Sequence, residues 1–100
     1  MQVRQAQKLV YSHLKKIGYT NIETTPTHAF LHLVEEIGEV SRALLHRTTK
    51  RNKLPVTTKP TELEDEVADI FWQTLKLASY LKIDLETAFV KKYEKNKAKR

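Results

Sequence analysis

The sequence predicts an all-α protein built as a four-helix bundle that oligomerisation completes. Apolar residues recur at intervals of three and four along four separate segments, as on amphipathic helices. No segment shows the alternation of apolar and polar residues that marks a half-buried strand. Only two of the 100 residues are glycine and 40% are hydrophobic, which is typical of a chain with a folded core. We therefore expect one domain over residues 1–100, with a basic tail at 94–100 that frays.

The first helix is expected to end at Gly18, because glycine readily adopts the left-handed conformation that closes a helix. The apolar positions before it follow helical spacing: Ala6, Leu9, Val10, Leu14 and Ile17. Residues 19–25 are expected to form a loop.

The second helix is expected to start at Pro26 and to run to about Arg47. Thr25 has the side-chain oxygen of an N-cap, and a proline at the first helical position loses no hydrogen bond. The apolar stripe that we expect in the core comprises Phe30, Leu33, Val34, Ile37, Val40 and Leu44. Helical rotation places a second row along one flank of this stripe: His32, Glu36, Glu39 and Ala43.

The third helix is expected to repeat this arrangement after an exposed loop at residues 48–60. Thr61 and Glu64 have the spacing of a capping box at its start. Trp72 falls roughly opposite the apolar stripe of this helix, so we expect it in a subunit interface rather than in solvent or against a base. The stripe comprises Leu63, Val67, Ile70, Phe71, Thr74, Leu77 and Ala78, and the acidic flank comprises Glu62, Glu66, Asp69 and Gln73.

A fourth helix is expected to begin after Asp84, whose carboxylate suits an N-cap. Its apolar positions are Leu85, Ala88, Phe89 and Tyr93. The helix then continues into the lysine-rich end of the chain.

Acidic residues gather in two clusters of this otherwise basic chain. Glu36 with Glu39 and Glu66 with Asp69 are spaced i,i+3, which places both carboxylates of each pair on one helical face. Each pair alone is typical of a solvated surface. Two helices joined by one loop pack antiparallel, however, and bring the two pairs face to face. Four convergent carboxylates repel one another unless a hard cation, magnesium or manganese, lies between them. The clusters hold eight of the twelve acids: Glu35, Glu36, Glu39, Glu62, Glu64, Asp65, Glu66 and Asp69.

Composition excludes several other classes. The chain has no cysteine, so disulfides and thiolate metal sites are excluded. No window approaches the ~20 apolar residues of a membrane span, so we expect a cytoplasmic protein with no membrane partner. The net charge of +6 comes largely from residues 47–59 and 91–100, and it suits either nucleic acid or an anionic phosphate substrate. A non-catalytic basic module that binds nucleic acid is the alternative function, although it leaves the acidic pairs unexplained.

Two other kinds of metal site agree less well with the sequence. His28 and His32 are spaced i,i+4 as in some zinc sites, but no third nitrogen or thiolate ligand is evident, so a solvent-side or substrate-side role is favoured. A di-iron bundle needs Glu-x-x-His pairs. In this chain Glu36 is followed three residues later by Glu39, and Glu66 by Asp69, so neither pair contains a histidine.

The two acidic motifs resemble those of the MazG-like nucleotide pyrophosphohydrolase family. The chain reads Glu36-Ile-Gly-Glu39, then twenty-six residues, then Glu66-Val-Ala-Asp69. The family's pattern is Glu-x-x-Glu, a spacer and Glu-x-x-Asp. The resemblance covers roughly residues 26–96 and implies an all-helical fold in which these four side chains are the catalytic and metal-binding residues.

The resemblance also implies an activity and an assembly. The reaction would be magnesium-dependent hydrolysis of a (deoxy)nucleoside triphosphate to the monophosphate and pyrophosphate, in nucleotide-pool sanitation or regulation, with manganese as a possible substitute. Glu35 or a metal-bound water alone would be the general base. Lys92 and Asn96, in the ending KYEKN, would contact the substrate phosphates. A homodimer or homotetramer is implied as well, in keeping with a chain short enough that a monomer buries only roughly two thirds of its unfolded surface.

Two residues depart from the family's pattern. Lys99 stands where the family often has an arginine, and lysine binds phosphate less well because it cannot form a bidentate contact. His46 stands where some members stack an aromatic ring on the base. The resemblance therefore implies no particular base.

Overall fold

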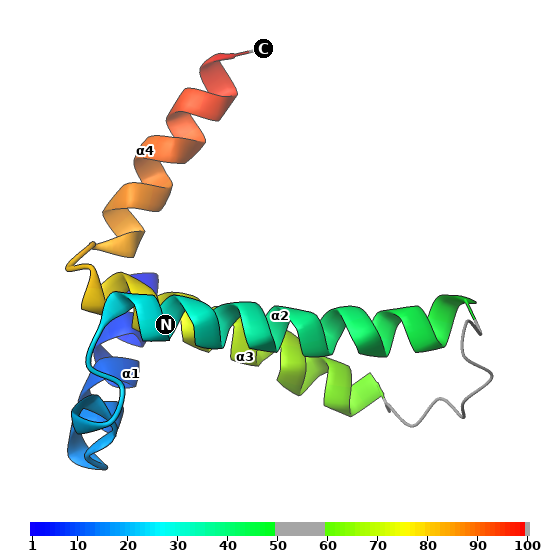
Figure 1. Cartoon of the computed structure of the whole chain (residues 1–100). Coiled ribbons are helices and arrows are strands. Elements are labelled where there is room, and N and C mark those ends of the chain that lie inside the picture. The colour runs from blue at the N-terminus through cyan, green and yellow to red at the C-terminus, as the bar shows by residue number, and fades with distance from the viewer. Residues whose placement is uncertain (50–59, 100) are drawn as a thin grey trace.

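The computed structural model describes the backbone of residues 1–49 and 60–99, and the side chains of residues 1–45 and 63–99. Within these residues the chain forms four α-helices and no strand (Figure 1). The helices are α1 (Val3–Lys16), α2 (Pro26–Thr49), α3 (Pro60–Tyr80) and α4 (Leu85–Ala98), with a short 3-10 helix, η1 (Tyr19–Asn21), after α1. The predicted all-α class with four helices is confirmed. None of the described helices is both long enough and apolar enough to cross a membrane.

Helices α2 and α3 form an antiparallel hairpin, and α1 packs across one end of α3 (Figure 1). The buried core lies at this crossing, where Val10 and Leu14 of α1 meet Leu75 of α3. Four partly buried residues pack around it: Val3, Ala6, Tyr19 and Leu85. The core therefore holds one end of the hairpin, and the remainder of the hairpin extends from it.

The helix ends follow the local signals in the sequence. The Thr25 hydroxyl accepts a hydrogen bond from the His28 N–H at 3.2 Å, and α2 begins at Pro26 as predicted. Gly18, with φ +79°, follows α1 in the left-handed conformation. The predicted loop at 19–25 was only partly right, because η1 lies within it. Helix α2 runs to Thr49, two residues beyond the predicted end.

Helix α3 begins at Pro60, one residue before the predicted cap at Thr61. The side chain of Thr61 lies outside the described residues, so the predicted capping box is not described. Residues 50–59 of the predicted loop also lie outside the described residues. The predicted loop at 48–60 is therefore wrong at both ends, which are helical.

The stripe of large apolar residues on α2 is not the face that packs within the chain. Phe30, Val34, Ile37 and Leu44 are each between 46% and 51% exposed. Two buried positions of α2, Ala29 and Ala43, lie in the row that also carries the partly buried His32 and Glu36. Val40 is the buried member of the predicted stripe.

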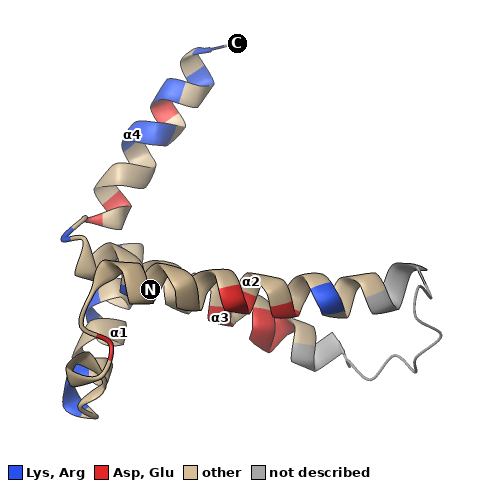
Figure 2. Cartoon of the chain, viewed as in Figure 1, with Lys and Arg blue, Asp and Glu red and all other residues tan. Residues whose placement is uncertain are grey.

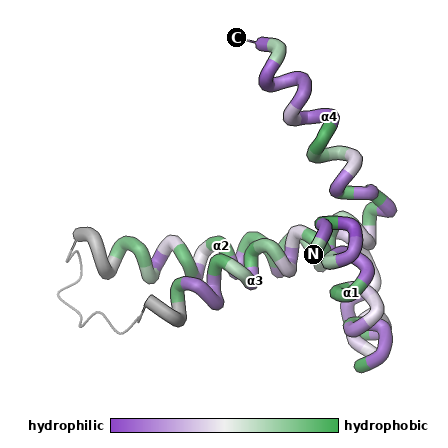
Figure 3. The backbone as a smooth tube through the Cα atoms, turned by 180° about the vertical axis from the view of Figure 1, so that it is seen from behind, coloured by the Kyte–Doolittle hydropathy of each residue, from purple (hydrophilic) through white to green (hydrophobic). Residues whose placement is uncertain are grey.

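The predicted core stripes are therefore only partly right: Val40 and Ala78 are buried, whereas most of the large residues stay half exposed in the single chain. The small side chains of the alanine-containing row are buried, whereas the bulkier residues of the stripe keep about half of their surface exposed. On α3, Val67 and Phe71 of the predicted stripe are also about half exposed. Hydrophobic residues recur along both helices (Figure 3).

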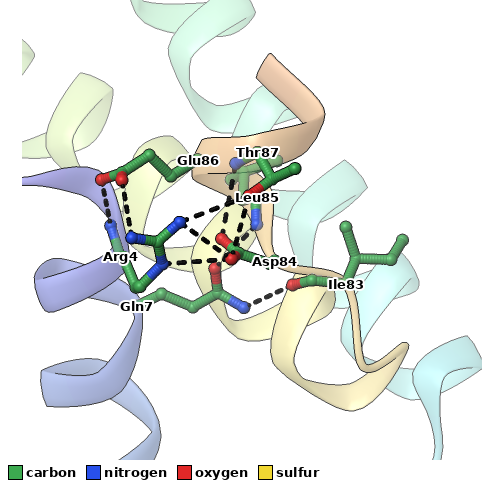
Figure 4. A network of polar contacts seen from close by, with 7 residues as sticks. All are labelled: Arg4, Gln7, Ile83, Asp84, Leu85, Glu86 and Thr87. Atoms are coloured by element: carbon green, nitrogen blue, oxygen red, sulfur yellow. Dashed lines mark hydrogen bonds and ion pairs between the residues drawn. The ribbon is translucent and has the colours of Figure 1, made fainter. Parts of the chain in front are cut away.

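Helix α4 points away from the hairpin (Figure 1). Its first turn is held against α1 by a polar network (Figure 4), in which Arg4 Nε donates to Asp84 Oδ2 at 3.0 Å. The Gln7 side chain donates to the carbonyl of Ile83 at 2.7 Å and accepts from the N–H of Leu85 at 3.1 Å. Asp84 also caps α4 as predicted. The direction of α4 is thus set at its N-terminus, and no residue of the helix is buried.

Candidate functional site

The four predicted carboxylates lie in the α2–α3 hairpin, two on each helix. Figure 2 shows the acidic residues of the two helices on adjoining stretches of the hairpin. Glu36 and Glu66 are partly buried, whereas Glu39 and Asp69 are exposed. Each i,i+3 pair therefore has one partly buried member and one exposed member.

The electrostatics of Glu36 show that carboxylates from both helices are neighbours. Burial raises the pKa of Glu36, and the negative charges of Glu39 on the same helix and Asp69 on α3 raise it further. Among charged neighbours, only those of like sign raise the pKa of a carboxyl group, so Glu39 and Asp69 both lie near Glu36. The site is therefore a concentration of negative charge around a partly desolvated carboxyl group.

Glu66 lacks a partner for part of its carboxylate. Its Oε2 atom is buried and accepts no hydrogen bond from any residue that the structure describes, and the same holds for Oε1 of Gln73 further along α3. A buried oxygen without a partner is costly, and more so when it carries charge. These unsatisfied oxygens fit a cation with oxygen ligands, which the donor set of four carboxylates also favours.

The carboxylates do not form a closed metal cage as they stand. In the described parts of the chain, no three His, Asp or Glu side chains converge closely enough to hold a metal ion. Glu39 and Asp69 are exposed and have room to change rotamer toward Glu36 and Glu66. The residues thus fit magnesium by their chemistry, with ligation requiring side-chain rotation.

Lys92 and Asn96 lie on a different part of the molecule. Both are exposed on α4, which leads away from the hairpin and its carboxylates (Figures 1 and 2). The structure of one chain therefore does not bring Lys92 and Asn96 to the four carboxylates. Glu35, the candidate base, is exposed on α2, and its charge also raises the pKa of Glu36. The side chain of His46 lies outside the described residues.

A buried polar cluster behind the carboxylates was not predicted. Lys76 of α3 is 1% exposed, and its Nζ lies 2.8 Å from Oε1 of Glu23 and 2.9 Å from Nδ1 of His32. On its other side, His32 Nε2 lies 3.5 Å from Oε1 of Glu36. Both ring nitrogens of His32 therefore face protein groups, and the i,i+4 zinc pair with the exposed His28 is not formed.

A signal for Lys76 was present in the sequence. Lys76 continues the row of Asp69 and Gln73 along α3, within an apolar segment. A lysine at such a position requires a buried partner. The partner, Glu23, precedes α2 in a segment without helical periodicity, and nothing in the sequence indicates it.

Comparison with known proteins assigns the chain to a family. The MazG nucleotide pyrophosphohydrolase domain matches residues 24–100, which include α2, α3, α4 and all four carboxylates. The protein belongs to the MazG nucleotide pyrophosphohydrolase family. A search of curated proteins and a search of solved structures each found no match.

Proposed function

We propose that the protein hydrolyses a (deoxy)nucleoside triphosphate to the monophosphate and pyrophosphate, with magnesium held by Glu36, Glu39, Glu66 and Asp69. The observation that carries the proposal is the buried Oε2 atom of Glu66, which has no partner among the described residues, and the raised pKa of Glu36 beside Glu39 and Asp69 agrees with it. Membership of the family supports the class of reaction. Nucleotide-pool sanitation or regulation in the cytoplasm is the role that fits this reaction.

Each side chain has a part in this proposal. The four carboxylates carry about four negative charges, which roughly two divalent ions balance. Once bound, magnesium neutralises charge on the phosphates and acidifies the water that attacks phosphorus. Glu36 and Glu66, which are partly buried, would hold fixed ligand positions, and the exposed Glu39 and Asp69 would complete the set of carboxylates that holds magnesium. Manganese has the same preference for oxygen ligands and is expected to substitute.

We further propose that a second copy of the chain completes the site. The radius of gyration is 16.3 Å, whereas a compact chain of this length has a value of about 13 Å. The exposed apolar residues of α2 and the outward direction of α4 both support an assembly of two or four copies. In such an assembly, Lys92 and Asn96 of one copy would meet the phosphates held at the carboxylates of another.

A nucleotide screen tests the reaction. Purified protein is incubated with canonical and modified nucleoside triphosphates in magnesium, and pyrophosphate and orthophosphate are measured separately. We expect pyrophosphate and the monophosphate in equal amounts. Glu39→Gln and Asp69→Asn should abolish the release while leaving the helical circular dichroism unchanged, because each removes one ligand charge and keeps the shape of the side chain.

Asp65→Asn is the matched control for Asp69→Asn, because Asp65 is also exposed on α3 and lies outside the proposed ligand set. It should retain wild-type turnover. Wild-type turnover by both Glu39→Gln and Asp69→Asn at saturating magnesium would rule out the metal assignment. Release of orthophosphate alone would show a different reaction, and nucleic-acid binding without any hydrolysis would favour the basic-module alternative.

A further inference from the structure

The buried cluster behind the carboxylates draws on three separate segments. Glu23 lies between η1 and α2, His32 lies on α2, and Lys76 lies on α3. The Glu23 side chain is 7% exposed, so its 2.8 Å contact with Lys76 Nζ is a shielded ion pair. Removing one partner from such a pair leaves a buried charge uncompensated, whereas replacing both with neutral groups is tolerated far better.

The hydrogen bonds of the cluster assign the tautomer of His32. A lysine ammonium has hydrogens to donate and no lone pair, so at 2.9 Å from Lys76 Nζ the Nδ1 atom of His32 is the acceptor. Two other groups lie near Nδ1, the Tyr19 hydroxyl at 3.3 Å and Oε2 of Glu23 at 3.5 Å. The hydroxyl donates its single proton to Oε2 of Glu23 at 3.1 Å, and Lys76 at 2.9 Å is the closest group to Nδ1 and its donor. Neutral His32 therefore carries its proton on Nε2.

The Nε2 atom of His32 faces the carboxylate of Glu36 and lies 3.5 Å from its Oε1. The ring is held from behind by Lys76, and Lys76 is itself fixed by Glu23 and lies 5.2 Å from the centre of the Tyr19 ring. An unbroken series of contacts thus runs from the segment after α1, through the hairpin, to one of the four carboxylates.

We propose that Lys76 and His32 position Glu36 for metal binding: Lys76 orients the imidazole, and the imidazole presents its Nε2–H to the carboxylate. This inference rests on the proposed function of Glu36. A fixed donor restricts the rotamers of a carboxylate and leaves its other lone pairs for the cation, and loss of such support typically lowers metal affinity about 10–100-fold. Tyr19 and Glu23 precede residues 24–100, so part of this arrangement lies outside the family match.

Two amide substitutions at His32 separate positioning from mere packing. In His32→Gln the amide nitrogen can occupy the place of Nε2, whereas in His32→Asn the shorter side chain can replace only Nδ1. We expect His32→Asn to bind manganese about 10–100-fold more weakly than the wild type, and His32→Gln to retain most of the affinity. The measurements are titration calorimetry with Mn²⁺ on substrate-free protein and thermal unfolding in EDTA.

A spectroscopic readout tests the tautomer directly. Long-range ¹H–¹⁵N spectra near pH 8 should show His32 as the Nε2–H form, with its signals identified by their absence in His32→Gln. The double variant Glu23→Gln/Lys76→Met removes both buried charges together and should lose this tautomer preference and weaken manganese binding to a similar extent as His32→Asn.

Three results would overturn the inference. An Nδ1–H tautomer in the wild type would contradict the assignment. His32→Asn and His32→Gln could instead bind manganese equally well, with any loss of affinity accompanied by a lower melting temperature in EDTA. That result would mean that His32 only fills space in the fold. A wild type that binds neither manganese nor magnesium would remove the proposed function and this inference together, whereas the first two results leave the proposed function intact.

Discussion

Glu36 on α2 and Asp69 on α3 lie close enough that the negative charge of Asp69 raises the pKa of Glu36 on the neighbouring helix. The two residues come from different halves of the hairpin, so their repulsion acts directly on the packing of α2 against α3. Without a cation, the hairpin is destabilised at the place where the proposed reaction occurs.

Replacing Glu36 with glutamine should therefore stabilise the metal-free protein at pH 7. A carboxyl group whose pKa is higher in the folded state binds more protons there than in the unfolded chain. Folding stability consequently falls as the pH rises from the ordinary value of 4.5 through the raised pKa. Glutamine removes this effect. Thermal unfolding in EDTA should show a higher melting temperature for Glu36→Gln at pH 7, and a difference that shrinks toward about pH 4.

The same comparison with Glu35→Gln is the control, because Glu35 is an exposed neighbour. It should change the melting temperature less than Glu36→Gln does. A Glu36→Gln protein that is less stable than the wild type at pH 7 in EDTA would mean that Glu36 is satisfied without a metal.

Divalent cations should raise the melting temperature of the wild type. A ligand at about 100 times its dissociation constant stabilises the folded state by about 2.7 kcal/mol, which corresponds to roughly 10 °C or more for a domain of this size. Magnesium and manganese should both act, and EDTA should reverse the shift. Sodium at matched ionic strength should not reproduce it, and an unchanged melting point in millimolar magnesium would indicate that the carboxylates are only a solvated surface.

The helices could be predicted because their signals are local. The Thr25 cap, the proline after it and the Asp84 cap act on their own helix ends and depend little on the rest of the fold. The i,i+3 spacing of the carboxylate pairs is also a local signal, because it fixes a shared face within one helix, and their role as metal ligands stays a prediction. That the two faces meet followed from the single connection between α2 and α3.

The packing partner of each face could not be predicted from periodicity. Periodicity identifies an apolar face, but it does not say whether the same chain or another copy covers it. On α2 the row with Ala29 and Ala43 packs inside the chain, and the row with Phe30 and Val34 stays half exposed. The ion pair of Glu23 and Lys76 was also beyond reach, because its two members come close only through the tertiary fold.

The contact of α1 with α4 should weaken in acid. Desolvation is the largest single influence on Asp84 and acts to raise its pKa, but the hydrogen bonds from Arg4 and Thr87 and the charge of Arg4 together outweigh it, so the pKa is lowered. A carboxyl with a lowered pKa stabilises the fold fully above its ordinary value of 3.8, and this contribution is lost as the pH falls through the folded-state pKa.

At pH 6 the wild type should therefore have a higher melting temperature than Asp84→Asn, and this difference should shrink below about pH 4. Asp65→Asn serves as a control for a general effect of removing an acid. A difference between wild type and Asp84→Asn that stays constant from pH 6 to pH 3 would contradict the role of the Asp84 charge.

The wild type should be an oligomer in solution, with a mass at least twice the 11.7 kDa of one chain. Trp72 was expected in a subunit interface. In the single chain its ring edge packs on His13 at 5.9 Å between centroids, and it remains 37% exposed beside a groove of about 560 Å³ between α1 and α3. An unpaired charge in an apolar contact is costly, so Trp72→Glu and Val34→Glu should each lower the mass seen by light scattering.

Thr27→Glu, at an exposed polar position of α2, should leave the mass unchanged. Because Trp72→Glu also disturbs the packing of α1, Val34→Glu is the more direct probe of an outer contact. A wild type that is monomeric at micromolar concentration would exclude both interfaces and would leave Trp72 available for stacking on a base.

Mixing two inactive variants should restore activity if Lys92 acts on the site of another copy. Asp69→Asn chains lack an intact carboxylate set but keep Lys92, and Lys92→Ala chains have the reverse defect. In a mixed dimer, one site then combines the intact carboxylates of one chain with Lys92 of the other. Random mixing of equal amounts makes half of the dimers mixed, so about one quarter of the wild-type activity should return after the subunits are exchanged. If Lys92 instead served the carboxylates of its own chain, every site in the mixture would retain one defect and the activity would stay at the level of the separate variants.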